Sequence, residues 1–232
     1  MRVGWDLLAR EYEEFERDIQ DVAGTFHEVA IVGLYEVGAA EAAEVDEQRR
    51  TAETEMDIAD AELEANFKLE TAKDRERTVG WLALIYLVIL VEQRVRKLKS
   101  RFDKSHPPKE KYPGKSTLEK LVNEFRDRFR INLEAHAAFE DWSDLVLARN
   151  EVVHHSGRPR DKYRKHTTRF IHTEQFMGGP EDLIVFSNSD FKESAEKMKG
   201  FVDWVVRQLI RVRDGCEPNA GRLRSLRTFQ LE

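Results

Sequence analysis

One short segment of the chain combines residue types that can transfer protons and bind phosphate. It reads Leu147-Ala148-Arg149-Asn150-Glu151-Val152-Val153-His154-His155-Ser156-Gly157. Histidine exchanges protons near neutral pH, and the forked guanidinium of arginine binds phosphate oxygens in pairs. Asn150 and His154 are four residues apart and share one face of a helix. Arg149 lies about 140° around the axis from His154, but the length of its side chain and the nearby helix end let the two converge.

An arginine beside a histidine suits cleavage of an RNA phosphodiester. The ribose 2′-hydroxyl can itself attack the adjacent phosphorus, so the protein has only to transfer protons and stabilise negative charge. One histidine cannot conveniently act as base and acid on opposite sides of an in-line displacement, but two copies in a symmetric dimer can. Glu151 and His155 are candidate supporting residues, because Glu151 is within helical reach of either imidazole.

The sequence Arg149-Asn150-x-x-x-His154 resembles the R-x4-6-H signature of the HEPN superfamily, in which a polar residue often follows the arginine. The expected position at a helix end, before a small residue and glycine, is also similar. The resemblance extends over residues 81–213. It implies a helical bundle that dimerises so that two motifs face one cleft, and a metal-independent, cofactor-free endoribonuclease of a toxin–antitoxin, abortive-infection or CRISPR defence system.

The resemblance also implies roles for individual residues. Arg149 would bind and stabilise the scissile phosphate, His154 would transfer protons, and Asn150 would orient His154 or the substrate. The chain departs from the family members that are paired with a nucleotidyltransferase antitoxin, which carry a tyrosine two residues after the histidine. Here that position is Ser156, so regulation through such a tyrosine is not expected.

The densest basic stretch of the chain directly follows the motif. Residues 149–172 hold seven arginine and lysine residues, two acidic residues and four of the seven histidines. We expect RNA binding by Arg158, Arg160, Lys162, Arg164, Lys165 and Arg169. Tyr163 and Phe170 lie among these cations and could stack on unpaired bases. The competing interpretation is an ordinary solvated loop and a hairpin anchored by an aromatic residue.

Composition excludes several other kinds of protein. The chain has 232 residues, of which 41% are apolar and 35% charged, which indicates a globular protein rather than a disordered one. A single cysteine, Cys216, excludes a disulfide framework and a multi-cysteine metal site. The histidines have no ligand spacing that favours a metal. No glycine-rich phosphate loop or G-x-S-x-G motif is present.

Two further features predict the location. The longest apolar run, Val79 to Val91, has thirteen residues. A membrane-spanning helix needs about 20, so a buried core helix is expected, and no membrane partner. The N-terminal residues also do not form the pattern of a signal peptide. We therefore expect a cytoplasmic protein.

Charge and proline divide the chain into two parts. Residues 1–80 carry 22 acidic and nine basic side chains, and all six prolines lie at or after position 107. The absence of proline permits long helices. Apolar residues recur at spacings of three and four in the first helix, as in a coiled coil; they are Trp5, Leu8, Tyr12, Phe15, Ile19, Val22, Phe26 and Val29. A thinner seam follows at Ala52, Met56, Ala59 and Leu63. We expect a long acidic helical extension over residues 1–78.

The remaining chain predicts a helical bundle. Helices are expected from Trp81 to Phe102, from Ser116 or Thr117 to about Arg130, from about Asn132 to His155 and from Asn188 or Ser189 to about Asp214. Thr117 and Lys120 do not make a capping box. Thr167 to Phe176 and Leu183 to Phe186 have the content of a short β-hairpin. The expected fold is therefore all-α, with a HEPN-like bundle over 79–213, an irregular or hairpin insertion and a tail over 214–232.

These observations favour a homodimeric endoribonuclease that binds RNA, acts as a toxin or in antiviral defence, and pairs with an antitoxin or regulatory protein. The main alternative is a catalytically inactive HEPN-like scaffold that binds RNA or protein. In that case Arg149 would form a structural ion pair with Glu151 or Asp144, and His154 would be buried. A third option is a toxin that is held inactive by a basic antitoxin bound to the acidic extension.

Overall fold

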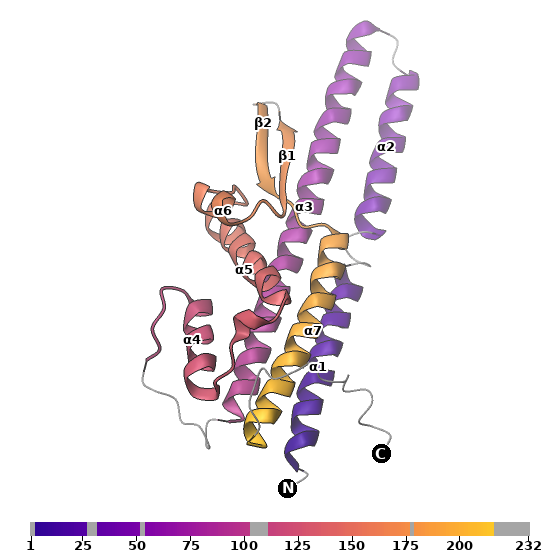
Figure 1. The fold of residues 1–232 in the computed structure, drawn as a ribbon. Helices are drawn as coiled ribbons and strands as arrows, with labels where there is room; N and C mark the ends of the chain where they lie inside the picture. The colour runs from indigo at the N-terminus through magenta and orange to yellow at the C-terminus, as the bar shows by residue number, and fades with distance from the viewer. Residues whose placement is uncertain (1–2, 27–31, 52–53, 103–110, 177–178, 216–232) are drawn as a thin grey trace. The chain divides into compact units, whose positions relative to one another are not determined.

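The computed structural model describes residues 3–26, 32–51, 54–102, 111–176 and 179–215. These residues are mostly helical, with one antiparallel β-hairpin, so the predicted fold class is confirmed. The elements are α1 (Val3–Thr25), α2 (Gly33–Thr51), α3 (Glu55–Ser100), α4 (Thr117–Phe129), a 3-10 turn (Leu133–Ala135), α5 (Ala138–His155), α6 (Asp161–His166), β1 (Ile171–Phe176), β2 (Gly179–Ile184) and α7 (Asn188–Arg213) (Figure 1).

The chain forms two compact units. The first unit comprises residues 1–17, 89–144 and 194–232, and the second comprises residues 18–88 and 145–193. Four helices, α1, α3, α5 and α7, contribute residues to both units. The boundary expected at residue 78 lies within α3, which continues unbroken for 46 residues. All candidate catalytic residues belong to the second unit.

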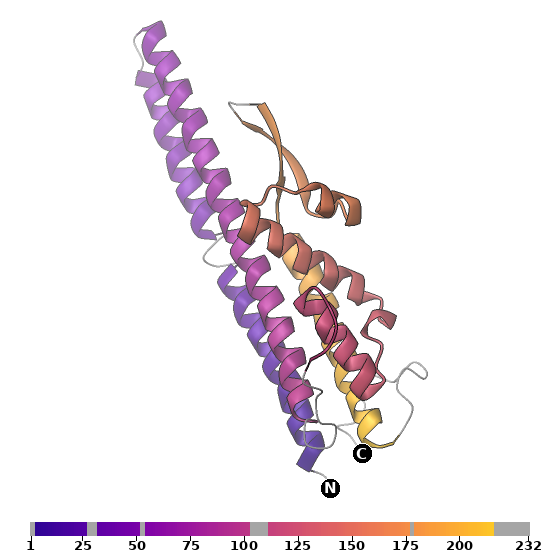
Figure 2. The ribbon, with the colours of Figure 1, turned by 90° about the vertical axis from the view of Figure 1, so that its left-hand side faces the viewer.

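In the second unit, α2 lies along the N-terminal half of α3 (Figures 1 and 2). Two ion pairs cross between these helices, from Lys68 Nζ to Glu44 at 2.9 Å and from the Arg75 guanidinium to Glu41 at 3.1 Å. Small residues such as Ala61, which is buried, allow the two helices to approach closely. Helix α2 and the N-terminal half of α3 therefore form a helical hairpin, which we call the arm.

The thinner seam expected in the arm is not buried. Met56 is 75% exposed and Leu63 is 63% exposed. Helix α2 packs instead against the face of α3 that carries Ala61 and Lys68, which is rotated from the seam by more than a quarter turn. The expectation for Ala52 lies outside the described residues.

The seam predicted in the first helix is confirmed in part, since Tyr12 and Val22 are half-buried. Phe15, Ile19 and Phe26 of this segment are all buried, whereas the expectation for Val29 lies outside the described residues. Glu11 is buried on the same helix, which the apolar pattern did not indicate. Its carboxylate accepts from Arg94 at 2.6 Å, within the first unit.

The β-hairpin belongs to the second unit, and its strands are shifted from the predicted ones: β1 begins at Ile171 rather than Thr167, and β2 ends at Ile184 rather than Phe186. Thr173 pairs with Asp182 and Phe176 with Gly179, so β2 begins four residues before the expected Leu183. Glu174 of β1 accepts a hydrogen bond of 2.6 Å from Arg77 of α3. The short helix α6 was not predicted from the sequence.

Local capping explains two helix boundaries in the first unit. Ser116 and Glu119 form a complete capping box at the start of α4, a pairing that inspection of Thr117 and Lys120 missed. The helix expected to begin at about Asn132 begins at Ala138 instead. There the Nδ1 atom of His136 accepts a hydrogen bond from the Ala138 amide at 3.2 Å, so it satisfies one of the free donors at the helix start.

Helix α3 is the one described helix that is long and apolar enough to cross a membrane, on length and composition alone. A core helix passes the same test. Leu84, Leu87 and Val88 have no exposed surface, so this part of α3 supplies the core of the second unit.

Candidate functional site

The final turns of α5 carry the sequence-predicted catalytic residues. Arg149 and Asn150 are half-buried, whereas His154 is exposed to solvent. His155 is half-buried, and its ring centroid lies 6.4 Å from that of His154. The Nε atom of Arg149 is buried, although the residue as a whole is half-buried. The structure therefore presents an accessible imidazole one turn beyond Asn150 on the same helix.

The end of α5 is held by a left-handed turn. Ser156 and Gly157 have φ angles of 51° and 76°, and the Gly157 amide donates to the Glu151 carbonyl at 3.1 Å. This hydrogen bond closes a turn of seven residues after the last regular turn of the helix, and the two left-handed residues prevent the helix from continuing. The predicted helix stop at Ser156-Gly157 is confirmed.

Side chains and backbone from two other elements fix this turn. The ring of Trp81, from α3, lies directly against Gly157. Its Nε1 donates to the Ile184 carbonyl at 2.7 Å, and the Ile184 amide donates to the Gly157 carbonyl at 2.7 Å. The position of His154 is therefore set by contacts with α3 and β2 within the second unit.

Glu151 binds Arg160 rather than a histidine ring. One carboxylate oxygen accepts from the Arg160 amide at 3.1 Å and from its Nε at 3.2 Å, and the other accepts from the terminal nitrogen at 3.1 Å. Burial alone would raise the pKa of Glu151, but these hydrogen bonds outweigh it and the pKa is lowered. Glu151, one of the two partners considered for Arg149 in an inactive scaffold, is thus bound by Arg160, and the other, Asp144, is buried on the same helix.

This arrangement predicts an acid-sensitive contribution to stability. A carboxyl group whose pKa is lower in the folded state than in the unfolded state stabilises the fold above its unfolded pKa. That contribution disappears as the pH falls through the folded value. We expect Glu151→Gln to reduce the free energy of unfolding by about 1–2 kcal/mol at neutral pH. The deficit relative to wild type should shrink when urea unfolding is repeated below pH 4.5, the ordinary pKa of a glutamic acid.

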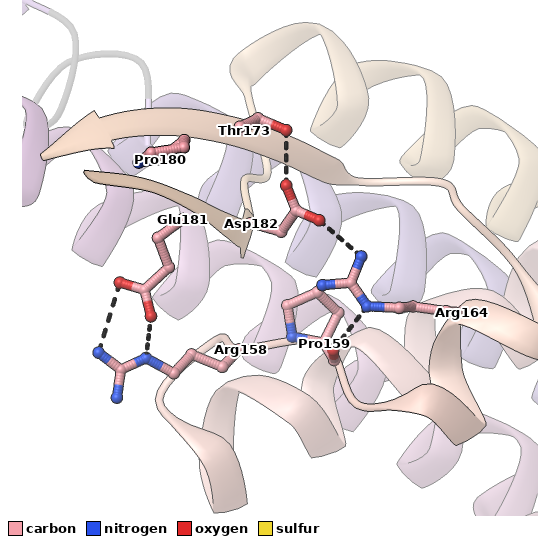
Figure 3. A pocket seen from close by; sticks show the side chains of 7 residues that line it. All are labelled: Arg158, Pro159, Arg164, Thr173, Pro180, Glu181 and Asp182. Carbon is pink, nitrogen blue, oxygen red and sulfur yellow. Dashed lines mark hydrogen bonds and ion pairs between the residues drawn. The ribbon is translucent and has the colours of Figure 1, made fainter. Parts of the chain in front are cut away.

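A pocket of about 440 Å³ lies just beyond the motif in the second unit. Figure 3 shows Arg158 facing Glu181 across it, with Asp182 between Thr173 and Arg164. The Arg164 guanidinium donates to Asp182 at 2.6 Å, and the Thr173 hydroxyl donates to the other oxygen at 2.5 Å. Hydrogen bonds from Thr173 and Arg164 lower the pKa of Asp182. Two arginines and two carboxylates therefore balance in charge.

The predicted RNA-binding cations fall into two groups. Four of them lie in ion pairs, namely Arg158 with Glu181, Arg160 with Glu151, Arg164 with Asp182 and Arg169 with Glu193. Lys162 and Lys165 of α6 are exposed and form no ion pair within the described part of the chain. The excess positive charge expected from this stretch is thus carried by the two lysines.

Tyr163 and Phe170 do not form a stacking surface. Both are buried, and the Tyr163 hydroxyl donates to the Arg169 carbonyl. The Phe170 ring packs against Phe186 with its centroid 5.2 Å away. The interpretation as anchors of the hairpin is therefore the correct one.

Large apolar side chains are exposed beside the motif. Val153, which directly precedes His154, is 52% exposed. Leu82 and Tyr86 of α3 are 61% and 55% exposed, and Leu82 follows the Trp81 that contacts the end of α5. Leu82 and Tyr86 are four residues apart, so they lie on one solvent-exposed face of α3. An exposed apolar group of this kind commonly marks an interface.

Several residues that shape the site were not indicated by sequence reasoning. Trp81 positions the helix end, while Glu181 and Asp182 hold two of the arginines. Glu181 and Asp182 are adjacent acidic residues close to the basic stretch. Their position could have predicted ion pairs with its arginines, because closely spaced arginines require carboxylates nearby. Among the described residues, no group of three histidine, cysteine or acidic side chains is arranged to hold a metal ion.

A scan of protein-family models and searches of curated proteins and of solved structures found no match to this chain. Function must therefore be inferred from the chemistry of the residues themselves.

Proposed function

We propose that this protein is a metal-independent endoribonuclease whose catalytic residues are Arg149 and His154. The observation that supports it best is the exposed imidazole of His154 at a rigidly stopped helix end, on the same helix as Arg149 and Asn150. A histidine that served only packing would be buried, which was the expectation for an inactive scaffold. The resemblance of Arg149-Asn150-x-x-x-His154 to the HEPN signature supports the same assignment.

The reaction is an in-line displacement on phosphorus. The ribose 2′-oxygen attacks while its proton passes to one imidazole, and the bond from phosphorus to the 5′-oxygen breaks as a second imidazole donates a proton to that oxygen. The products are a 2′,3′-cyclic phosphate and a 5′-hydroxyl. Arg149 stabilises the charge on the non-bridging oxygens, and Asn150 orients His154 or the substrate. Lys162 and Lys165 attract the phosphate backbone.

In this proposal the second imidazole is the His154 of a second subunit. We propose that a second copy packs over the exposed Val153, which adjoins His154 in sequence, together with the exposed Leu82 and Tyr86 of α3. In a twofold pairing through this face, each chain contributes one His154 to the region of the interface. The homodimer is therefore part of the catalytic proposal.

We expect Val153→Glu to convert the dimer to a monomer, because it places two like charges in an apolar interface. RNA cleavage should fall with it by at least about a hundredfold, since one of the two proton-transfer groups is lost. Sedimentation velocity and a cleavage assay on the same preparation measure both effects. Met56→Glu, at a more exposed apolar position of the arm, is the matched control and should change neither. A Val153→Glu protein that remains dimeric and active would refute this interface.

The activity itself is tested with purified wild-type protein, single-stranded RNA and an excess of EDTA. We expect cleavage that yields cyclic-phosphate and 5′-hydroxyl ends, and no cleavage of an oligonucleotide of the same sequence with 2′-deoxyribose throughout. Cleavage of that deoxy substrate, or cleavage that EDTA abolishes, would contradict the transesterification mechanism.

A toxin or antiviral effector is the biological role we propose, because the resemblance to the HEPN superfamily implies such a system and an active endoribonuclease would damage its host unless regulated. Such an enzyme acts in the cytoplasm, where its RNA substrates are. An antitoxin or regulatory protein is then the partner that restrains it.

One observation favours a second candidate function, that of a scaffold. Met56, Leu63 and Phe67 share one face of α3 and are 75%, 63% and 65% exposed, with the acidic Asp60 and Glu70 beside them. This face of the arm suits a partner helix that is both apolar and basic. RNA binding without cleavage in the EDTA assay, together with partner binding that Phe67→Ser abolishes, would favour the scaffold over the nuclease.

A further inference from the structure

A second pocket, in the first unit, contains an excess of positive charge. It has a volume of about 410 Å³ and is formed by the last turns of α3, the segment before α4 and the first half of α4. Its lining includes Arg96, Lys99, Lys111, Tyr112, Lys120 and Glu124. None of these residues belongs to the motif on α5.

The one carboxylate of this pocket is already neutralised. Glu124 is buried, and it accepts from Lys99 at 2.7 Å and from Arg128, which lies outside the pocket lining. Lys111 and Lys120 are exposed, and neither forms an ion pair within the described part of the chain. Arg96 is held loosely by Glu92, at 3.8 Å across one helical turn.

The pocket in the second unit provides a contrast. There, Arg158 and Arg164 face Glu181 and Asp182, so no net charge remains for a ligand. In the first unit, Arg96, Lys111 and Lys120 line a cavity whose one carboxylate among the described lining residues is already paired. Like charges held together in this way repel one another, and an anion of high charge density relieves the repulsion.

We propose that the pocket of the first unit binds a ligand that carries two or more phosphate groups. Three cations match the charge of a di- or triphosphate, and charge-assisted hydrogen bonds to phosphate oxygens are the strongest that lysine and arginine make. The hydroxyl groups of Tyr112 and Thr117 line the same cavity and supply neutral donors. The volume is that of a small-molecule site. This site is independent of the proposed nuclease, because it shares no residue with the motif.

The test is isothermal titration of tripolyphosphate into the full chain at low ionic strength. The variant Lys111→Glu/Lys120→Glu removes the two exposed cations of the pocket and leaves the buried Glu124 network intact. We expect its affinity to be at least about tenfold weaker than that of wild type. The control Lys73→Glu/Lys192→Glu makes the same change in net charge at exposed positions outside the pocket lining, and should bind within about twofold of wild type. Equal weakening in both variants, or no binding by wild type, would overturn the proposal.

A second titration identifies the source of the phosphates. A single-stranded oligodeoxynucleotide has the phosphate backbone of a nucleic acid but no 2′-hydroxyl, so the proposed nuclease cannot cleave it. If the pocket variant loses affinity for tripolyphosphate alone, its ligand is a small polyphosphate. If it loses affinity for the oligonucleotide as well, the pocket also accepts nucleic-acid phosphates. Both titrations measure binding in the absence of cleavage, so failure of the nuclease proposal would leave their outcome unaffected.

Discussion

Replacement of His154 by alanine is expected to slow RNA cleavage in EDTA by about a thousandfold, the range typical of a lost general acid or base. The side chain is exposed, so its removal should leave the thermal midpoint of unfolding unchanged. His172→Ala is the matched control, because this histidine is also exposed in the second unit but lies on β1. It should retain the wild-type rate.

Arg149→Ala should reduce the rate by about a hundredfold to a thousandfold, the effect of losing one group that stabilises the transition state. Arg149 is half-buried, so part of any loss could come from altered packing. Arg149→Lys separates the two contributions: it keeps the positive charge and most of the stem but not the forked geometry. We expect it to fold like wild type and to cleave more slowly. Wild-type cleavage by both His154→Ala and Arg149→Ala would refute the assignment.

Gly157→Ala is expected to lower the free energy of unfolding by about 2–4 kcal/mol. The glycine has a φ angle of 76°, which a residue with a side chain adopts at a cost, and its added methyl group would overlap the Trp81 ring. Displacement of that ring would also disturb its hydrogen bond to Ile184. Because the turn fixes the end of α5, cleavage should fall together with stability.

A glycine in open space provides the control. Gly200 lies within α7, and nothing approaches the position of its absent Cβ within 4 Å. Gly200→Ala should therefore stabilise the protein by about 0.5–1 kcal/mol. Urea unfolding of the three proteins measures both signs. A Gly157→Ala protein as stable as wild type would show that the turn does not constrain the helix end.

Local patterns in the sequence were sufficient to predict most helices. The absence of proline before position 107 and the apolar seam with Phe15 and Ile19 indicated long helices, and Ser156-Gly157 indicated the end of α5. These features depend on neighbours within a few residues along the chain. One local prediction was wrong because another local group caps the helix. The His136 imidazole accepts a hydrogen bond from the Ala138 amide, so α5 begins at Ala138, later than the apolar pattern suggested.

The remaining features depend on residues far apart in the sequence. Trp81 contacts Gly157, which lies 76 positions later in the chain. Nothing in the sequence around either residue predicts this contact. The apolar seam of the arm was misassigned because alanine and ion pairs, rather than Met56 and Leu63, face α2. The periodicity of apolar residues identifies an apolar face of a helix. It does not show which face of that helix a neighbouring helix packs against.

The same distinction applies to the candidate site. The sequence placed Arg149, Asn150 and His154 at one helix end, which depends only on helix geometry. The sequence analysis overestimated the excess positive charge near the motif, because Arg158 and Arg164 form ion pairs with Glu181 and Asp182 of the hairpin. The pairing depends on the hairpin register, which places β2 four residues earlier than predicted. The sequence placed Glu151 within helical reach of the histidines. In the structure, the chain after the turn positions Arg160 beside Glu151, and the two side chains form an ion pair.

The most direct test of the central proposal, that an imidazole at position 154 transfers the protons of RNA cleavage, is chemical rescue of His154→Ala. Because the side chain is exposed, free imidazole can reach the space that it leaves. Single-turnover cleavage of RNA is measured in EDTA at increasing imidazole concentration, with Arg149→Ala as the comparison. We predict that the rate of His154→Ala rises with imidazole and that the rate of Arg149→Ala does not. Equal stimulation of the two variants, or a rate of His154→Ala that does not respond to imidazole, would contradict a proton-transfer role for His154.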